Sequence, residues 1–535
     1  MAANTVLEYL VPMRDGIKLY TIVQLPEKSG SFPVIISRSP YQSEQIDFEQ
    51  LRQENTHGYA VVSQQCRGTA RSEGECNAYL NERNDGLDLL EWVRQQPFYN
   101  GEIYLFGGSY TASVHLSYLN TNPPDVKAAL LAVQDSNRYN ICFRHGFFKI
   151  GLHGSWVMKM HKKNQPVERN FTAATFRTMP LAGITQTIFN EYVPYIEESF
   201  SHPDPDDPYW STPEGGSDYQ DACNKCDIPI LLITSMYDIY TEGIFDMWKK
   251  LSPVRKKNCA LVVTPFDHAY NPAVLPAEMQ DFQDAVLDKC VPDLKYVWFD
   301  HFRLGTVLPF VQKGKTVYYR LWDNSWHSTP ELTNAPQRNQ FFLTSGRTLA
   351  ASSAPGKITY TSNPYDPAFF AGGLCNNFGG MQLQDPPNSR YDIISFFSEP
   401  LENDLICEGH MELELHCSST AEDTCFYARI SFERNGKTLP LRDDIDSLCR
   451  LEKNYTPGTE RIVNFIFAPH AFKLLAGDRL RVDISSSCAP HFHVHTNQRG
   501  LQALQTSAKI CRNTIITGSS CLSIYTKIQR WLVNE

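Results

Sequence analysis

The chain has 535 residues, 42% of them hydrophobic and 20% charged, which is the composition of a globular protein with two or three domains. Its net charge of -10 argues against nucleic acid and anionic membranes as main partners. No apolar run approaches the length of a membrane-spanning helix, and Met1 to Arg14 lacks the basic-then-apolar layout of a signal peptide. We therefore expect a cytoplasmic protein.

The first part of the chain alternates apolar runs with helical patterns. Tyr9 to Pro26 is predicted to form two strands around a turn, and Asn84 to Arg94 has helical spacing. Continuous apolar runs are typical of strands buried on both faces, and alternation with helices predicts a parallel α/β sheet. The runs are Pro33 to Ser37, Tyr59 to Ser63, Ile103 to Phe106 and Ala128 to Val133.

The pattern changes twice further along the chain. Helical patches around Ile141 to Lys162 and Phe171 to Tyr195 predict a helical insertion, after which the apolar runs Pro229 to Thr234 and Ala260 to Thr264 resume the sheet. Beyond about Ser325, short alternating segments predict an all-β jelly roll. The predicted domains are an α/β-hydrolase core (residues 1–140 and 225–325), a helical cap (141–224) and a jelly-roll domain (326–535).

The segment Ile103 to Ser113 has the order strand, sharp turn, helix that a nucleophile elbow requires. Gly107, Gly108 and Ala112 are small, as the tight turn around Ser109 demands. The turn lifts the hydroxyl of Ser109 off the end of the sheet and turns the amide of Tyr110 toward a reacting carbonyl. The sequence therefore predicts Ser109 as a nucleophile.

A nucleophilic serine needs a base and an acid that orients it, in the chain order Ser, Asp or Glu, His for this fold. The two resumed strands run into Asp238 and His268, which places both residues at the same sheet edge as Ser109. Asp267 is a rival for the acid, but adjacent side chains usually diverge, so Asp238 is preferred. Asp246 falls inside an apparent helix and is interpreted as a surface charge.

With these residues in place, the sequence resembles the CocE/NonD hydrolases, the group of cocaine esterase and α-amino acid ester hydrolases, akin to X-Pro dipeptidyl-peptidases. The resemblance covers nearly the whole chain. It rests on Val11 to Leu19, Ser39-Pro40-Tyr41, Arg67-Gly68, Arg71 to Gly74, Asp85 to Asp88, Glu91-Trp92, Gln96-Pro97, Gly107 to Tyr110, Tyr237-Asp238, His268 and Phe397 to Leu401.

The resemblance implies Ser109 as nucleophile, His268 as base and Asp238 as its orienter. It also implies an oxyanion hole made by the Tyr41 hydroxyl and the Tyr110 amide, a preset pair of donors for developing negative charge. Two positions depart from the family pattern. Ala112 stands where the family usually has Gly, and Gln65 stands where an Asp is usual in the Arg-Gly loop.

The remaining candidates are interpreted as structural. Cys223-x-x-Cys226 is a lone pair, without the second pair expected of a zinc site. The histidines His491, His493 and His495 alternate as on one face of a strand; a metal is possible there, but a polar strand face is favoured. We expect no metal and no cofactor.

Phe147 and Trp156 lie in the predicted cap, which by resemblance roofs the site, and are candidates for the acyl pocket as much as for the core. The sequence predicts a serine hydrolase that cleaves a small acyl ester or amide through an acyl-enzyme, with homo-oligomers possible. The alternatives are a peptidase or β-lactam acylase, and a non-catalytic protein that binds through its jelly roll. An aminopeptidase would need carboxylates near the pocket to hold an ammonium, and the acidic stretch Asp204 to Asp207 is a candidate whose position the sequence does not give.

Overall fold

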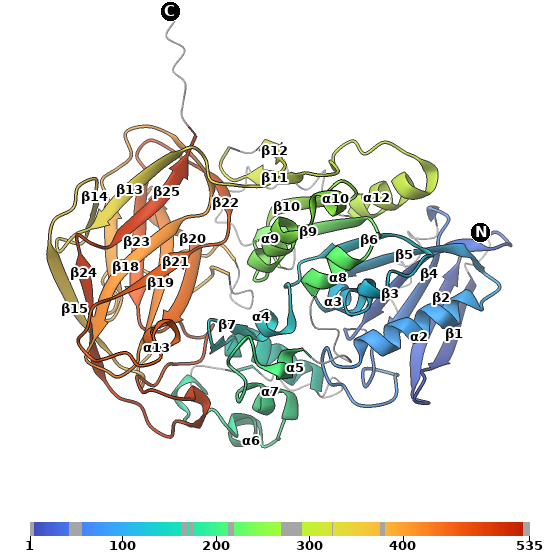
Figure 1. The fold of residues 1–535 in the computed structure, drawn as a ribbon, viewed down its shortest axis with the longest axis horizontal. Coiled ribbons are helices and arrows are strands. Elements are labelled where there is room, and N and C mark those ends of the chain that lie inside the picture. Colours follow the sequence, from blue (N-terminus) through green and yellow to red (C-terminus); the bar gives the residue numbers. More distant parts are fainter. Residues whose placement is uncertain are drawn as a thin grey trace, which may run out of the picture.

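The computed structural model describes residues 5–41, 56–161, 170–171, 175–211, 219–268, 292–323, 325–374 and 380–527. Two sheet-based units lie side by side along the longest axis of the molecule (Figure 1). One is a mixed sheet from the first part of the chain, covered by helices, and the other is all-β. Among the described helices, none is long and apolar enough to cross a membrane.

The first sheet has ten described strands in the order β1-β2-β4-β3-β5-β6-β9-β10-β11-β12. Every pairing from β4 through β11 is parallel, as the alternating pattern predicted. The strands are β1 (Thr5–Pro12), β2 (Lys18–Leu25), β3 (Phe32–Ser39), β4 (Ala60–Gln65), β5 (Tyr99–Gly108), β6 (Val126–Ala132), β9 (Ile230–Tyr237), β10 (Ala260–Asp267), β11 (Thr316–Arg320) and β12 (Ser325–Thr329).

Helices cover both faces of this sheet, which explains the continuous apolar runs of its strands. Successive residues of a strand point to opposite faces, so Ile36 and Leu105 join one core cluster and Ile35 and Tyr104 join another. The indole of Trp298 donates to the carbonyl of Ala129, 3.1 Å away. The helices around the sheet are α2 (Glu82–Arg94), α3 (Tyr110–Leu116), α8 (Tyr219–Lys225), α9 (Thr241–Lys250), α10 (Pro253–Lys256) and α12 (Pro292–Leu304).

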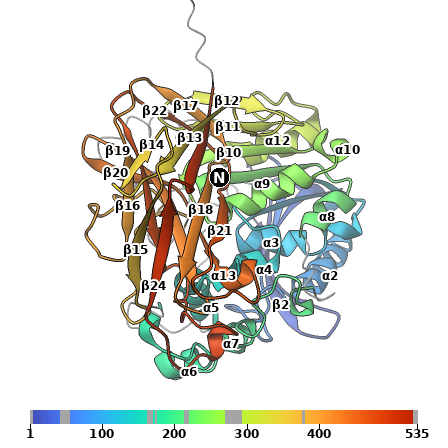
Figure 2. The same cartoon turned by 60° about the vertical axis from the view of Figure 1, so that its left-hand side comes forward.

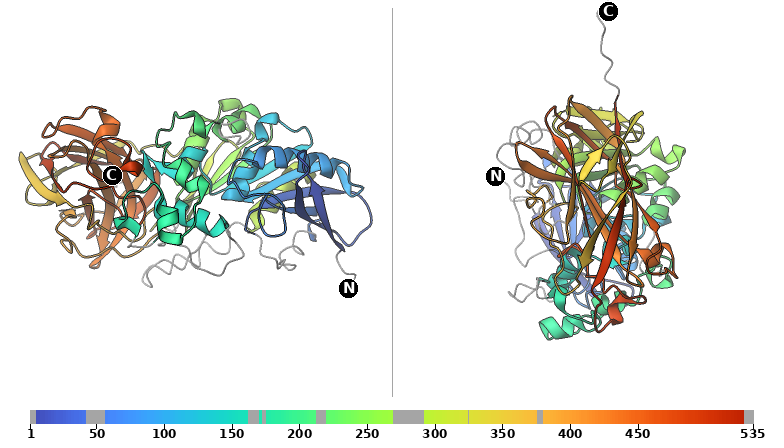
Figure 3. Two further views of the ribbon diagram at one scale, coloured as in Figure 1. Left: turned by 90° about the horizontal axis from the view of Figure 1, so that it is seen from below. Right: turned by 90° about the vertical axis from the view of Figure 1, so that its left-hand side faces the viewer.

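The inserted region is less helical than predicted. Its helices are short: α4 (Arg138–Cys142), α5 (Ser155–His161), α6 (Ile184–Phe189) and α7 (Pro194–Ser199). Between α4 and α5 the chain forms a hairpin, β7 (Phe143–Arg144) and β8 (Phe147–Phe148), turned at His145 and Gly146, both with positive φ. Seen from below, this region lies between the two sheet units (Figure 3).

The second unit contains strands β13 to β25, which form one thirteen-stranded arrangement within the described residues. Figure 2 shows these strands in front of the first sheet. They are β13 (Gln337–Leu343), β14 (Thr348–Ala350), β15 (Gly356–Ser362), β16 (Ile394–Ser398), β17 (Leu405–Gly409), β18 (Glu412–Ser419), β19 (Cys425–Arg434), β20 (Lys437–Ser447), β21 (Arg461–Ile466), β22 (His470–Leu474), β23 (Arg479–Ser485), β24 (Cys511–Thr517) and β25 (Cys521–Thr526), with one short helix, α13 (Leu448–Leu451).

The all-β unit contacts the first sheet at the end of β9. The buried guanidinium of Arg442 on β20 donates to the carbonyl of Met236 (2.6 Å) and to those of Ala468 and Pro469 (3.0 and 2.6 Å). The hydroxyl of Tyr237 donates to the carbonyl of Pro440, 2.9 Å away. Burial lowers the pKa of Arg442 to about 10, so the group remains a cation at neutral pH.

Replacing Arg442 by Met should lower the free energy of unfolding by about 2–3 kcal/mol, because the buried carbonyls would lose their donor. Urea denaturation measures this effect. Arg512→Met, at an exposed position of β24, is the control and should change stability by less than about 0.5 kcal/mol. Equal stability of the two variants would contradict a structural role for the Arg442 contacts.

Candidate active site

A strained turn presents the predicted nucleophile. Ser109 follows β5 directly with φ 56° and ψ -129°, in the left-handed half of φ space, and α3 begins at the next residue. A Cβ added at Gly107 would lie 2.0 Å from the carbonyl oxygen of Thr111, so only glycine fits there. Gly108 faces no such crowding, since its nearest neighbour would be 3.7 Å away. The turn therefore depends on Gly107 more than on Gly108.

Three predicted residues meet at the carboxyl edge of the first sheet. His268 Nε2 lies 3.0 Å from Ser109 Oγ, and His268 Nδ1 lies 2.7 Å from Asp238 Oδ1. A carboxylate only accepts hydrogen bonds, so Nδ1 carries the proton and Nε2 is left as an acceptor for the serine hydroxyl. Of the two acids that the sequence offered, Asp238 is the one that contacts the imidazole.

The carboxylate of Asp238 is completely buried and held by donors on both oxygens. The hydroxyl of Thr234 donates to Oδ2 at 3.0 Å, and the amide of Tyr240 donates to Oδ1 at 3.2 Å. These donors hold the plane of the carboxylate relative to the His268 ring. Thr234 was not identified from the sequence. The pattern that could have indicated it is a hydroxyl residue at the end of an apolar run, four positions before Asp238.

Tyr41 reaches the nucleophile from the loop after β3. The residue as a whole is 41% exposed, whereas its hydroxyl contacts the Ser109 side chain. Burial raises the pKa of this phenol, and its contacts with the Ser109 side chain, the Trp156 indole and the Tyr110 amide act in the opposite direction. The Tyr41 hydroxyl thus lies close to both the Ser109 side chain and the Tyr110 amide, which the predicted oxyanion hole requires.

Comparisons with known proteins identify the family. Residues 15–270 match the family model of X-Pro dipeptidyl-peptidase (S15 family), and residues 303–523 match that of the X-Pro dipeptidyl-peptidase C-terminal non-catalytic domain. Cocaine esterase from Rhodococcus sp. (strain MB1 Bresler) is 23% identical, with 94% of each chain covered. The chain belongs to the family of X-Pro dipeptidyl-peptidases and cocaine esterase, which are serine hydrolases.

Solved structures show the same fold. An aminopeptidase from the marine sediment archaeon Thaumarchaeota archaeon matches with a TM-score of 0.79 and 17% identity, covering 98% of this chain and 97% of the other. An α-amino acid ester hydrolase matches with a TM-score of 0.78 and 17% identity over the same shares of both chains. A CocE/NonD family hydrolase from Staphylococcus aureus gives a TM-score of 0.67 at 17% identity, covering 98% and 94%.

The two aromatic pocket candidates of this hydrolase lie in different places. Trp156 on α5 stacks on Tyr110, with ring centroids 5.4 Å apart, and meets Tyr41 edge-on at 6.4 Å. Phe147 instead stacks on His493, 5.3 Å away, at the contact between the hairpin and the all-β unit. The structure therefore brings Trp156, but not Phe147, to Tyr41 and Tyr110 beside Ser109.

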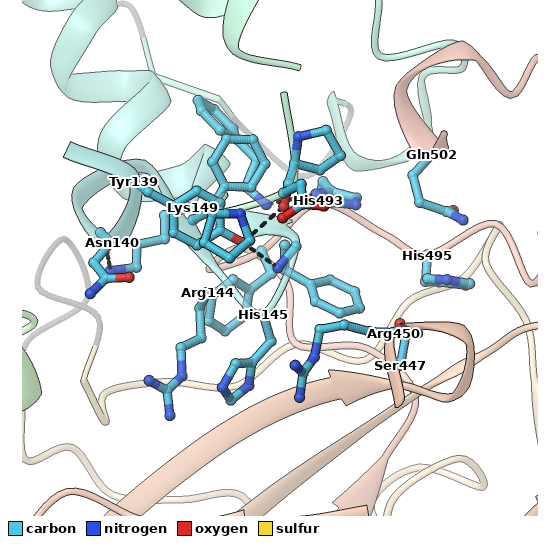
Figure 4. Close-up of a pocket in the computed structure, with 18 of the residues that line it drawn as sticks. Tyr139, Asn140, Arg144, His145, Lys149, Ser447, Arg450, His493, His495 and Gln502 are labelled. Atoms are coloured by element: carbon cyan, nitrogen blue, oxygen red, sulfur yellow. Dashed lines mark hydrogen bonds between the residues drawn. The ribbon is translucent and has the colours of Figure 1, made fainter. Parts of the chain in front are cut away.

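Phe147 lines a separate cavity of about 1270 Å³ between the insertion, helix α9 and the all-β unit. Figure 4 shows Arg144, His145 and Arg450 on the side of this cavity that faces the β-strands. Arg144 pairs with Glu242 of α9 and with Asp444 of β20, and so connects both sheet units. Neither Ser109 nor His268 is among the described residues that line the cavity.

The three alternating histidines do not lie on a strand, contrary to the sequence prediction. The chain after Pro490 follows an irregular path, in which all three imidazoles are buried. His493 Nδ1 accepts from the amide of Phe148 (2.9 Å), and His495 Nε2 lies 3.2 Å from Asp423. Over the described parts of the chain, no three His, Cys, Asp or Glu side chains group as metal ligands.

Cys223 and Cys226 are buried beside Arg255, whose Nε donates to the carbonyl of Cys223 at 3.0 Å. Burial raises the pKa of Cys226 to about 11, which disfavours the thiolate form that metals and disulfide exchange need. These observations fit the structural interpretation of the pair.

Thr234→Val keeps the shape of the side chain but removes the donor to Asp238. We expect kcat to fall by about one order of magnitude, because the carboxylate would hold the imidazole less firmly. Steady-state kinetics with a chromogenic ester measure the change. Thr187→Val, on the exposed face of α6, serves as the control, and equal kcat values for both variants would contradict this role.

Proposed function

We propose that this serine hydrolase cleaves carboxylic esters of small acyl groups through a covalent acyl-enzyme on Ser109. The observation that supports this proposal most strongly is the position of the His268 ring, which bridges Ser109 Oγ and Asp238 Oδ1 at 3.0 and 2.7 Å. The acid, base and nucleophile are within hydrogen-bonding distance, as this reaction requires.

In the first half-reaction, Ser109 Oγ attacks the acyl carbonyl while His268 Nε2 takes the hydroxyl proton. Negative charge develops on the carbonyl oxygen, which accepts hydrogen bonds from the Tyr110 amide and the Tyr41 hydroxyl. The bond from the acyl carbon to the leaving oxygen then breaks, and the imidazolium returns its proton to that oxygen. An alcohol departs and the acyl group remains as an ester of Ser109.

In the second half-reaction, water takes the place of the alcohol. His268 Nε2 removes a proton from the water as its oxygen attacks the Ser109 ester, and the same two donors stabilise the second oxyanion. Collapse of this intermediate breaks the bond to Ser109 Oγ, which recovers its proton from the imidazolium. The products are a carboxylic acid and the free enzyme.

Esters are favoured over amides because an alcohol leaves without strong protonation. Aminopeptidase activity would in addition need a carboxylate beside the nucleophile to hold an ammonium. The positions of the candidate stretch Asp204 to Asp207 support the ester proposal: Asp204 and Asp206 line the cavity of Phe147, and Asp207 pairs with His202 at 2.8 Å. The aromatic rings of Tyr79 and Trp156 pack on the ring of Tyr110.

The covalent intermediate is tested by labelling with a fluorophosphonate probe. We expect the folded wild type to be labelled, Ser109→Ala to lose the label, and Ser113→Ala, a buried serine on the same helix, to keep it. A wild type that folds but does not label would favour a non-catalytic binding protein. A panel of p-nitrophenyl esters and aminoacyl anilides then separates esterase from peptidase activity, and faster hydrolysis of the anilides would overturn the ester proposal.

Tyr41→Phe should lower kcat by roughly one to three orders of magnitude with little change in stability, since it removes one donor from the oxyanion while the ring stays in place. Tyr192→Phe, at a position 56% exposed, is the matched control and should retain the wild-type rate. An unchanged rate in Tyr41→Phe would show that the second donor comes from elsewhere.

A further inference from the structure

The side chain of Tyr110 is anchored away from the nucleophile, although its backbone amide faces it. The ring is 3% exposed, and its hydroxyl donates to Glu82 Oε1 at 2.6 Å and accepts from the amide of Tyr79 at 3.0 Å. Burial and the nearby Glu82 carboxylate raise the pKa of this phenol well above its usual value, so it stays a neutral donor. Tyr110 is the first residue of α3, so fixing its side chain also fixes the amide that follows the serine.

The other oxygen of Glu82 lies beside Arg38 of β3, the strand that precedes Tyr41. Arg38 Nη1 lies 2.8 Å from Glu82 Oε2 and donates to the carbonyl of Glu82 at 3.0 Å. Arg38 is completely buried near the end of β3, and its Nε donates to the side chain of Gln64 on β4 at 2.9 Å. Three residues further along the chain is Tyr41, whose amide donates to Ser39 Oγ at 3.1 Å.

One buried carboxylate therefore contacts both segments that supply the oxyanion donors. Glu82 is 4% exposed and is the first residue of α2, so it belongs neither to α3 nor to β3. We propose that Glu82 is a positioning residue, which holds the Tyr110 amide and the Tyr41 hydroxyl at a fixed separation for the tetrahedral intermediate. This inference rests on the proposed function of the Ser109 site.

The physical basis is the geometric sensitivity of oxyanion stabilisation. The donors must already lie where the charge develops, and a displacement on the order of 1 Å can cost about 100-fold in rate. A backbone amide cannot adjust by rotating a side chain, so its position depends on how the residue is anchored. Neither Glu82 nor Arg38 touches the substrate in this scheme; both act through the two tyrosines.

The main test is Tyr110→Phe, which keeps the ring and the amide but removes the hydroxyl that bonds Glu82 and the amide of Tyr79. We expect kcat for an ester to fall about 10- to 100-fold while KM changes by less than about threefold, because the loss is confined to the transition state. The matched control is Tyr59→Phe, which removes an equally buried phenol bonded to a carboxylate, Asp300, at 2.7 Å. Tyr59 precedes β4, at the opposite end of that strand from the site, and its variant should keep kcat within about twofold.

A double-mutant cycle between Glu82→Gln and Tyr41→Phe gives a second readout. If Glu82 positions both donors, part of its effect on kcat disappears once the Tyr41 hydroxyl is gone. The fold-loss of kcat in the double variant should then be smaller than the product of the fold-losses in the two single variants. For Tyr59→Phe combined with Tyr41→Phe, the fold-loss of kcat should instead equal the product of the two single losses. The cycle also replaces the first test if Tyr110→Phe fails to fold.

The inference is overturned if folded Tyr110→Phe has the kcat of Tyr59→Phe, or if the Glu82–Tyr41 cycle is multiplicative, in an enzyme whose activity requires Ser109. Failure of the proposed function would look different: Ser109→Ala would then retain the activity of the wild type, whatever the effect of the tyrosine variants.

Discussion

The parallel pairing of β5, β6, β9 and β10 is the constraint on which the candidate site depends. In a parallel sheet all carboxyl ends lie at one edge, so residues that directly follow three strands become neighbours despite large separations in the chain. Ser109 follows β5, while Asp238 and His268 follow β9 and β10. Because the register fixes these strand ends, the 3.0 and 2.7 Å contacts of the imidazole need no long loops.

The all-β unit contributes to this edge from outside the sheet. Arg442 bonds the carbonyl of Met236 and Pro440 accepts from Tyr237, so the two residues before Asp238 are held by a unit more than 200 residues away in sequence. Arg144 on the inserted hairpin adds a second connection, through Glu242 and Asp444. The position of Asp238 thus depends on contacts from both sheet units.

The sequence predicted those features that follow from local pattern. Apolar runs indicated the buried strands, and their alternation with helical patterns indicated parallel pairing, which the structure confirms. Chain order indicated the three polar residues that follow the strands. Features that depend on tertiary packing were missed or misplaced. The hairpin at Phe143–Phe148 was expected to be helical, and the alternation of His491 to His495 suggested a strand. β12, placed in the jelly roll, pairs with β11 in the first sheet.

Several ring groups close to the candidate site are uncharged. Burial lowers the pKa of His153 to about 3 and raises those of Tyr110 and Tyr240, so these ring groups are neutral at physiological pH. The Glu82 carboxylate lies behind Tyr110, paired with Arg38, rather than facing the serine. In the proposed mechanism, an oxyanion formed on an acyl carbonyl would therefore meet the Tyr110 amide without a competing negative charge from these groups, which favours ester hydrolysis.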